Sequence, residues 1–302
     1  MKNSGKKIRA AKFSIGTALS LAAMKFTVGI LTGSMAVLSS AIDSMLDILM
    51  SGVNFLAIRQ AEQPADENHP YGHGKFETMA TLVQSLVIGG SGVWIMIESI
   101  RRLATGVAPT GLGSGIVVLA LSVAASLAIS RYLMKVAKET DSSALAADSL
   151  HFSMDVYTNL ALLAGVTAMV VFRLYWIDAL LSMLVACYIL YEASKLIRLS
   201  LKEVLDEQLP EPLRKQVESI IKQHCGKKYN FHNLRTRKAG SHKLIDFHLS
   251  VCKYLTVAEA HELTDDLEQE IAQAVQGADI TIHVEPCTFD DCDKEDCGGC
   301  NR

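Results

Sequence analysis

The chain has 302 residues, of which 50% are hydrophobic and 20% are charged, and its mean hydropathy is +0.24. This composition excludes a disordered chain and a collagen-like one, because neither is so apolar. The charged residues are unevenly spread: residues 1–200 hold 29 of them with a net charge of +3, whereas residues 201–302 hold 32 with a net charge of −6. We therefore expect a part of the chain in lipid, followed by a part in water.

Long stretches without a charged residue occupy much of the first 200 positions. Four of them come close to or exceed the ~20 residues that cross a hydrocarbon layer; they cover 26–42, 78–97, 103–130 and 156–172. With the charged, glycine and proline positions between them, these stretches predict six membrane spans. The predicted spans are 12–32, 36–60, 78–103, 112–135, 144–172 and 176–198. A soluble protein is the disfavoured alternative, because uniformly apolar helices in soluble cores are usually shorter.

The positions of Lys and Arg predict how the spans are oriented. If the N-terminus is cytoplasmic, the inner segments hold thirteen of these residues, and the outer loops hold three, namely Arg101, Arg102 and Arg173. Because basic residues remain on the cytoplasmic side, both termini are expected there, in a multi-pass protein of the bacterial inner membrane. A cleavable signal peptide is not expected, since the first apolar segment leads directly into another span. Glu98, near an outer end, is expected at the membrane interface.

From about residue 208 onward, the pattern is typical of a small soluble α+β domain. Thr256 and Glu259 have the spacing of a capping box, and residues 245–251 alternate with the period of a strand. The predicted elements, in chain order, are a helix over 210–223, strands over 230–237 and 244–252, a helix over 256–274 and a strand over 279–284. The helices of such a unit are expected to cover one face of its sheet. The chain is thus predicted to consist of an all-α six-helix transmembrane domain (1–208), a cytoplasmic αββαβ, metallochaperone-like domain (209–286) and a Cys- and Asp-rich tail (287–302).

Two pairs of potential metal ligands lie inside the predicted spans. Asp43 and Asp47 in the second span, and His151 and Asp155 in the fifth, each have the i,i+4 spacing that places both side chains on one helix face. A charged group in the membrane costs at least ~2.5 kcal/mol on insertion scales, so it indicates a functional site. Three carboxylates and one imidazole suit a tetrahedral Zn²⁺ and could also hold Cd²⁺ or Fe²⁺. Two hydrogen-bonded clusters between helices, without metal, are the alternative.

Two further groups of potential ligands lie outside the predicted spans. In the loop between the second and third spans, Asp66, His69 and His73 can converge on one ion at the cytoplasmic face, although an ordinary polar loop is an equal alternative. The tail carries four thiols among acidic residues, at Cys287, Cys292, Cys297 and Cys300. Reduced thiolates can capture soft or borderline divalent ions. The alternative is an acidic, disordered tail with incidental thiols, because these spacings match no zinc-ribbon pattern.

Taken together, these motifs resemble the cation diffusion facilitator family of metal/proton antiporters. The resemblance rests on DxxxD at 43–47, QPADxNHPYGHGKxE at 63–77, HxxxD at 151–155 and the histidine-bearing α+β region, and it extends to about residue 287. It implies a transport site at Asp43, Asp47, His151 and Asp155, and a loop site at Asp66, His69 and His73. Histidine at position 151 resembles the zinc-type subgroup, not the all-carboxylate set associated with manganese.

The resemblance also implies a binuclear metal site in the cytoplasmic domain. Its ligands would be His232, His248, His261, His283 and Glu285. Related zinc antiporters have Asp at the last of these positions, so here the carboxylate lies about 1.5 Å further out, the length of one C–C bond. Without the resemblance, these histidines would be interpreted as scattered surface residues.

The ligand chemistry predicts proton-coupled transport. Carboxylates and imidazole bind metal only when deprotonated, so metal loading releases protons and protonation expels metal. Imidazole titrates near pH 6.5 in model peptides, which allows exchange at physiological pH. The predicted function is efflux of a divalent metal ion by proton antiport, with the cytoplasmic domain as a metal sensor; a passive channel and an intramembrane zinc enzyme are the alternatives. The expected partners are divalent ions, protons, the lipid bilayer and a second copy of the chain, and no nucleic acid is expected. No cofactor is expected to be obligatory. Zn²⁺, or else Fe²⁺ or Cd²⁺, is expected to be both the substrate and the regulatory ion.

Overall fold

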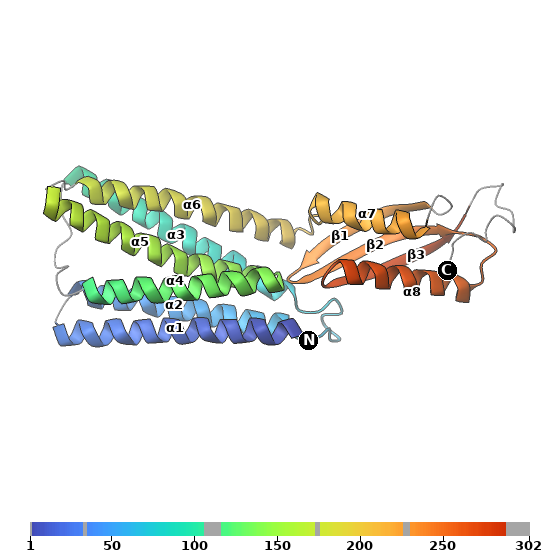
Figure 1. The fold of residues 1–302 in the computed structure, drawn as a ribbon, viewed down its shortest axis with the longest axis horizontal. Helices are drawn as coiled ribbons and strands as arrows, with labels where there is room; N and C mark the ends of the chain where they lie inside the picture. Colours follow the sequence, from blue (N-terminus) through green and yellow to red (C-terminus); the bar gives the residue numbers. More distant parts are fainter. Residues whose placement is uncertain (1, 33–34, 106–115, 173–175, 226–229, 288–302) are drawn as a thin grey trace. The chain divides into compact units, whose positions relative to one another are not determined.

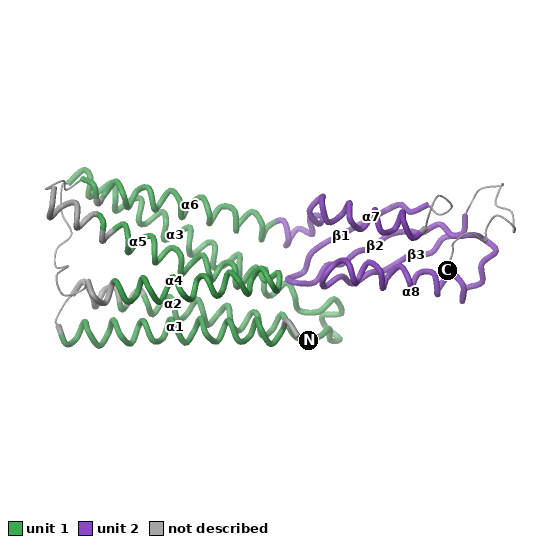
Figure 2. The backbone as a smooth tube through the Cα atoms, in the orientation of Figure 1, with its two compact units in different colours: residues 1–201 green, residues 202–302 purple. Residues whose placement is uncertain are grey.

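The computed structural model describes residues 2–32, 35–105, 116–172, 176–225 and 230–287 (Figure 1). Two compact units make up the chain, unit 1 over Met1–Leu201 and unit 2 over Lys202–Arg302 (Figure 2).

The described part of unit 1 consists of long helices. They are α1 (Lys2–Thr32), α2 (Met35–Ala61), α3 (Lys75–Thr105), α4 (Ile116–Thr140), α5 (Ser143–Phe172) and α6 (Trp176–Val204), whose last residues belong to unit 2. Among the described residues, four segments are long and apolar enough to cross a membrane: Ser4–Leu31, Lys75–Thr105, Ala120–Thr140 and Ala179–Val204. The two remaining helices, α2 and α5, have 27 and 30 residues. At 1.5 Å per residue, each is ~40 Å long or more and exceeds the ~30 Å hydrocarbon layer.

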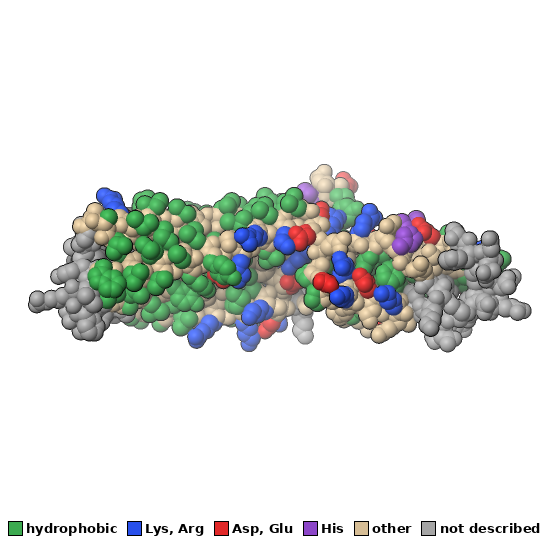
Figure 3. All heavy atoms as spheres, turned by 90° about the horizontal axis from the view of Figure 1, so that it is seen from above, with side chains coloured by type: hydrophobic (Ala, Val, Ile, Leu, Met, Phe, Trp, Pro, Cys, Tyr) green, Lys and Arg blue, Asp and Glu red, His purple; other side chains and the backbone are tan. Residues whose placement is uncertain are grey.

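Apolar side chains cover much of the outer surface of unit 1, as Figure 3 shows for one face. Leu31, Leu49 and Trp94 are 80%, 64% and 71% exposed. Such a surface is unfavourable in water and is the one that lipid tails would contact. Each of the six predicted spans coincides with one of these helices. The helices run beyond the predicted spans; α1 begins at Lys2 instead of residue 12, because hydropathy indicates only the apolar part of a helix that continues past the hydrocarbon layer.

Helix α5 packs against the other helices on two sides. Phe152 and Leu145 of α5 belong to one apolar cluster with buried residues of α1, α2 and α4, such as Ala10 and Leu133. Met154, two residues further along α5, belongs to a second cluster with residues of α3 and α6. Side chains of α6 pack directly against α3 at Gly92, since a Cβ there would lie 2.8 Å from the Ile189 side chain. The side chains of α5 are therefore held in fixed directions by packing on both sides.

Unit 2 has the predicted αββαβ order. Its elements are α7 (Glu211–Cys225), β1 (Asn230–Ala239), β2 (His242–Val251), α8 (Val257–Ala274) and β3 (Ala278–Pro286). The sheet order is β1-β2-β3, with β1 antiparallel and β3 parallel to β2. The predicted capping box is confirmed: the Thr256 hydroxyl accepts from the Glu259 N–H at 3.2 Å, and the Glu259 carboxylate accepts from the Thr256 N–H at 2.8 Å.

Both helices of unit 2 cover the same face of its sheet. Alternate residues of β2 share one core cluster with residues of α7 and α8; the cluster includes Ile245, Phe247, Leu249, Val251, Val217, Ile221, Leu267 and Ile271. Because successive side chains of a strand point to opposite faces, His248 projects from the face that the helices leave uncovered. The one-sided arrangement agrees with the sequence prediction.

Candidate metal sites

The first candidate site lies between α2 and α5. Asp47, His151 and Asp155 each offer a ligand atom, and these three atoms lie within 4.8 Å of one another. The Nε2 atom of His151 is 2.9 Å from Oδ1 of Asp47, and the side chains of these two residues are only 14% and 17% exposed. The side chain of Asp43, the fourth predicted ligand, lies outside the described part of the structure. The structure thus brings together the three predicted ligands whose side chains it describes; we call them the α2–α5 cluster.

The short contact in this cluster has a simple chemical meaning. A protonated Nε2 of His151 donates its hydrogen to the Asp47 carboxylate. A divalent ion placed among the same atoms would need Nε2 without that hydrogen. One location can thus hold either a shared proton or a metal ion, and the two occupants exclude each other.

The second candidate site is the loop between α2 and α3. The Asp66 carboxylate lies 3.2 Å from Nδ1 of His69 and 3.2 Å from Nε2 of His73, and the three residues form a group within 4.8 Å. Nδ1 of His73 is 3.1 Å from the carbonyl oxygen of Pro64 and can donate to it, which leaves Nε2 as the metal-binding nitrogen. Gly72 has a φ of +78°, a conformation that glycine adopts without strain, and its N–H donates to the His69 carbonyl at 2.9 Å.

Backbone N–H groups stabilise the ionised form of the Asp66 carboxylate. It accepts hydrogen bonds from the N–H groups of His69 at 2.7 Å and Asn68 at 3.0 Å. The hydrogen bond from the His69 N–H is the main cause that holds the pKa of Asp66 below its usual value. The His69 side chain and the Asn68 N–H lower this pKa further. The carboxylate therefore remains ionised, as a metal ligand must.

The third candidate site is a row of histidines across the sheet of unit 2. His232 pairs in register with His248, and His248 pairs with His283, so all three lie side by side on the uncovered face. His232, His248 and Glu285 form a group of ligand atoms within 4.8 Å. His248 Nδ1 is 2.7 Å from Glu285 Oε1, His232 Nε2 is 3.4 Å from Glu285 Oε2, and His283 Nε2 is 3.8 Å from Glu285 Oε1. The hydrogen bond from His248, as the main cause, lowers the pKa of Glu285 below its usual value.

His261, the other predicted ligand of this domain, is not in the described cluster. It lies on α8, its side chain is 74% exposed, and its Nδ1 is 3.5 Å from Asp265. Because α8 covers the opposite face of the sheet, His261 does not reach the histidine row within its own chain. The sequence alone does not give the distance between His261 and the row, since that distance depends on how α8 packs in the folded domain.

The predicted tail site is described at one position only. Cys287 is partly buried, and its backbone N–H donates to the carbonyl of Val251 at 2.7 Å, so the peptide chain runs beside the end of β2 at this point. Cys292, Cys297 and Cys300 lie outside the described residues.

Comparison with known proteins identifies the family. Residues 11–205 match the family model of a cation efflux transmembrane domain, and residues 209–287 match that of a cation efflux protein's cytoplasmic domain. The chain belongs to the cation efflux family. This is the cation diffusion facilitator family that the motifs resemble, so the chain is a cation efflux transporter with an integral, multi-pass membrane domain and a cytoplasmic C-terminal domain. Membership in a transporter family excludes the intramembrane enzyme.

Individual members of the cation efflux family are similar over most of the chain. The cation-efflux pump FieF of Shewanella oneidensis is 35% identical over 277 residues, covering 92% of this chain and 93% of that protein. FieF of Escherichia coli O1:K1 / APEC is 34% identical over 257 residues, or 85% of each chain. Among solved structures, the zinc form of the putative zinc transporter CzrB is 40% identical and covers 27% of this chain and 92% of that one, with a TM-score of 0.26. The metal-bound C-terminal domain of the CzcD transporter from Thermotoga maritima is 26% identical and covers 26% of this chain and 92% of that one, with a TM-score of 0.24.

The structure of this cation efflux transporter also shows a buried polar group beside the α2–α5 cluster that the sequence analysis missed. Asp148 of α5 is 1% exposed. It accepts a hydrogen bond from Ser14 of α1 at 2.5 Å and another from Gln84 of α3 at 3.4 Å. Gln84 in turn accepts from Asn54 of α2 at 2.6 Å. The sequence does indicate this group, because Asp148 is an acidic residue inside a predicted span, three positions before His151.

A second buried polar group joins the cytoplasmic ends of four helices. The ammonium of Lys7 on α1 lies 2.6 Å from the carboxylate of Glu62, just after α2, and 3.2 Å from that of Glu77 on α3. Lys7 and Glu77 are both 1% exposed. Glu77 also accepts from the Ser142 hydroxyl and from the Ala144 N–H at the start of α5. Glu77 thus ties the first turn of α5, the ligand-bearing helix, to α1 and α3.

Proposed function

We propose that this cation efflux transporter exports divalent metal ions, zinc foremost and iron or cadmium as further substrates, in exchange for protons. The observation that carries the proposal is the α2–α5 cluster, where Asp47, His151 and Asp155 offer one nitrogen and two carboxylate oxygens within 4.8 Å. A mixed nitrogen and oxygen set favours borderline ions such as Zn²⁺ over hard ions such as Mn²⁺. Asp43, one helical turn before Asp47, would supply the fourth ligand.

Coupling to protons follows from competition for the same atoms. A metal ion arriving from the cytoplasm displaces the proton between His151 and Asp47, and protons arriving from outside displace the metal. Alternating access to one site then converts an inward proton gradient into outward metal transport. The buried surroundings support this exchange, because water and other ions have little access to the cluster.

We further propose that unit 2 senses cytoplasmic metal in a homodimer of the bacterial inner membrane. The histidine row is exposed and leaves room for further ligands, so metal bound there can favour one arrangement of two chains. The loop site, close to the cytoplasmic ends of α2 and α3, would bind metal as it enters.

Transport by sealed vesicles tests the proposal directly. Zinc uptake into inside-out vesicles would be measured with and without an acidic lumen, for the parent chain and for Asp47→Ala and His151→Ala. We expect uptake that depends on the pH gradient and that is lost in Asp47→Ala. Zinc flux indifferent to the gradient would instead indicate a passive channel, and full activity in both variants would exclude the α2–α5 cluster as the transport site.

A further inference from the structure

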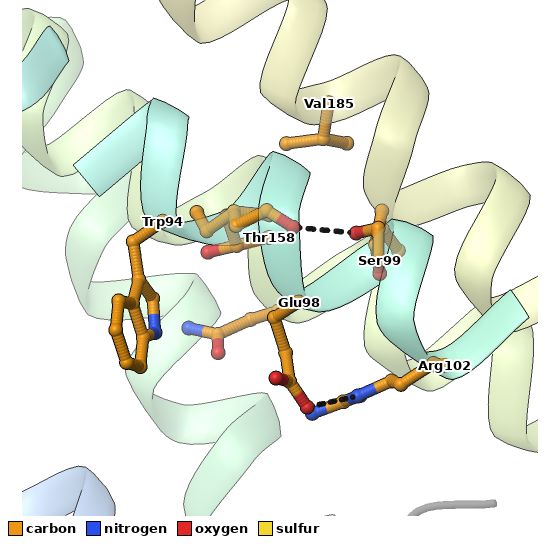
Figure 4. A pocket seen from close by; sticks show the side chains of 10 residues that line it. Trp94, Glu98, Ser99, Arg102, Thr158 and Val185 are labelled. Carbon is orange, nitrogen blue, oxygen red and sulfur yellow. Dashed lines mark hydrogen bonds and ion pairs between the residues drawn. The ribbon is translucent and has the colours of Figure 1, made fainter. Parts of the chain in front are cut away.

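A cavity of about 310 Å³ lies between α3, α5 and α6, and both polar and apolar side chains line it (Figure 4). Its polar lining residues include Glu98, Arg102, Thr158, Asn159 and Ser182. From the sequence alone, Glu98 is expected only at the membrane interface. The cavity shares no residue with the three candidate metal sites.

The cavity begins one helical turn outward from the α2–α5 cluster. Thr158 and Asn159 follow Asp155 by three and four residues on α5, which is about 5 Å along the helix axis and on the same side of the helix. Because the C-terminal domain is cytoplasmic, α6 ends at the cytoplasmic side and α5 runs from that side outward. An ion that leaves Asp155 in the direction of export therefore meets this cavity next.

Four of the polar lining residues offer an oxygen atom that could bind a cation. They comprise the Glu98 carboxylate, the hydroxyls of Thr158 and Ser182, and the side-chain amide of Asn159. The Thr158 hydroxyl donates to backbone carbonyls of α5, so its oxygen lone pairs stay available to a cation. An all-oxygen set holds a borderline ion such as Zn²⁺ less tightly than a set with imidazole, which suits a position that an ion must leave quickly.

The charge of Glu98 is balanced by its neighbour on the same helix. Oε1 of Glu98 accepts from Nε of Arg102 at 3.1 Å, and their side chains are 37% and 34% exposed. Figure 4 shows the two groups turned toward each other at the cavity wall. A carboxylate with no cation close by would be unfavourable at this depth. Since an arginine side chain is long and flexible, its guanidinium can move toward the membrane surface when another cation takes its place.

We propose that this cavity is a second, oxygen-donor position for the outgoing divalent ion, and that Glu98 exchanges Arg102 for the ion as it passes. The proposal rests on the proposed function, because it needs an ion leaving the α2–α5 cluster. Glu98 is then a transient ligand of the ion, and Arg102 neutralises the Glu98 carboxylate again once the ion has left the cavity.

The test measures zinc uptake into inside-out vesicles, whose lumen contacts the outer face of the protein. Glu98→Gln is compared with two matched controls: Arg101→Gln, adjacent on α3 but outside the cavity lining, and Glu192→Gln, which removes a similar intrahelical pair with Lys195 on α6. We expect Glu98→Gln to lower the maximal rate about fivefold with little change in KM, because loading from the cytoplasm is untouched. Both controls should keep the parental rate.

Luminal Mn²⁺ provides a readout that a merely structural role of Glu98 would not change. Because Mn²⁺ prefers oxygen ligands, it should compete at the cavity from the outer side and slow zinc uptake by the parent chain. We expect Glu98→Gln to abolish this inhibition and Glu98→Asp, which keeps the carboxylate, to retain it. If Glu98→Gln does not fold, Glu98→Asp is measured in its place. Because Glu98→Asp keeps the carboxylate, it must then show the parental rate and the parental Mn²⁺ inhibition.

The outcomes separate this inference from the function on which it rests. If the parent chain takes up no zinc, or Asp47→Ala takes up as much, the proposed function fails. If the parent chain transports and Asp47→Ala does not, but Glu98→Gln keeps the parental rate and the parental response to Mn²⁺, the proposed function stands and the second ion position is overturned.

Discussion

The α2–α5 cluster and the histidine row of unit 2 use the same ligand types in opposite surroundings. In the membrane, His151 and Asp47 are 14% and 17% exposed and come from two packed helices. In unit 2, the side chains of His232, His283 and Glu285 are 47%, 65% and 33% exposed on an uncovered sheet face. Ligand chemistry alone does not distinguish a transported ion from a sensed one. The structure separates them by access to water, since the first group is shielded between two helices and the second is open to solvent on a sheet face.

Removal of a ligand from the buried cluster is the strongest test of the difference between the two sites. We expect Asp155→Ala to lower zinc transport by a factor of ~100 or more, since loss of one anionic ligand leaves the remaining groups unable to hold the ion. Zinc binding by unit 2 should be unchanged in the same protein. Vesicle uptake and calorimetric zinc titration of the detergent-solubilised chain would measure the two effects, and a parallel loss of binding in unit 2 would mean that the sites are not separate.

Stability provides the next contrast between buried and exposed charges. Lys7→Met would leave the Glu62 and Glu77 carboxylates in unit 1 without their shared cation, and removal of one partner from a buried ion pair typically costs ~3–5 kcal/mol. Lys215→Met is the matched control, because Lys215 pairs with Glu211 at 2.7 Å but both side chains are more than half exposed. Exposed pairs contribute ~0–1 kcal/mol. Thermal unfolding in detergent should therefore show a large decrease for Lys7→Met and almost none for the control.

A substitution in the histidine row should separate sensing from transport. We expect His248→Ala to weaken zinc binding by unit 2 at least ~10-fold, or about 1.4 kcal/mol, because His248 is the central member of the row. At saturating zinc and with a fixed pH gradient, transport should change much less than in Asp155→Ala. His242→Ala on the same strand is a control, since His242 lies outside the metal-binding groups found among the described residues. Equal loss of binding in both variants would contradict the assigned ligands.

The smallest expected effect concerns the pH dependence of the exposed row. Because hydrogen bonding lowers the pKa of Glu285, this carboxylate stays ionised as the pH falls, and protonates only below the usual carboxylate range. Between pH 7 and 5.5, Glu285 should therefore contribute nothing to any change in zinc affinity. Glu285→Gln should bind zinc more weakly at each pH but with the same dependence on pH. Titrations at several pH values would measure the slope, and a flatter one in the variant would mean that Glu285 itself titrates in this interval.

Local patterns in the sequence predicted much of this structure. The spacing of Asp47 with Asp43, and of His151 with Asp155, defines one helix face in each case, and the Thr256 capping box depends on neighbouring residues alone. The buried polar groups depend instead on distant partners: Ser14 and Gln84 lie 134 and 64 residues from Asp148. No periodicity reports such contacts. The separation of His261 from the histidine row was beyond prediction for a related reason, since it depends on how α8 packs in the whole domain.

The ion pair of Lys7 with Glu77 can form only late in the synthesis of the chain. The two residues are 70 positions apart, so α1 and α2 leave the ribosome before α3 exists. During that interval the Lys7 end of α1 has no Glu77 to bind and must keep contact with water at the cytoplasmic surface. Only the arrival of α3 allows Lys7 to become buried, and Glu77 then meets the first turn of α5 later still. The complete set of contacts around Glu77 therefore forms only after the start of the fifth helix has been synthesised.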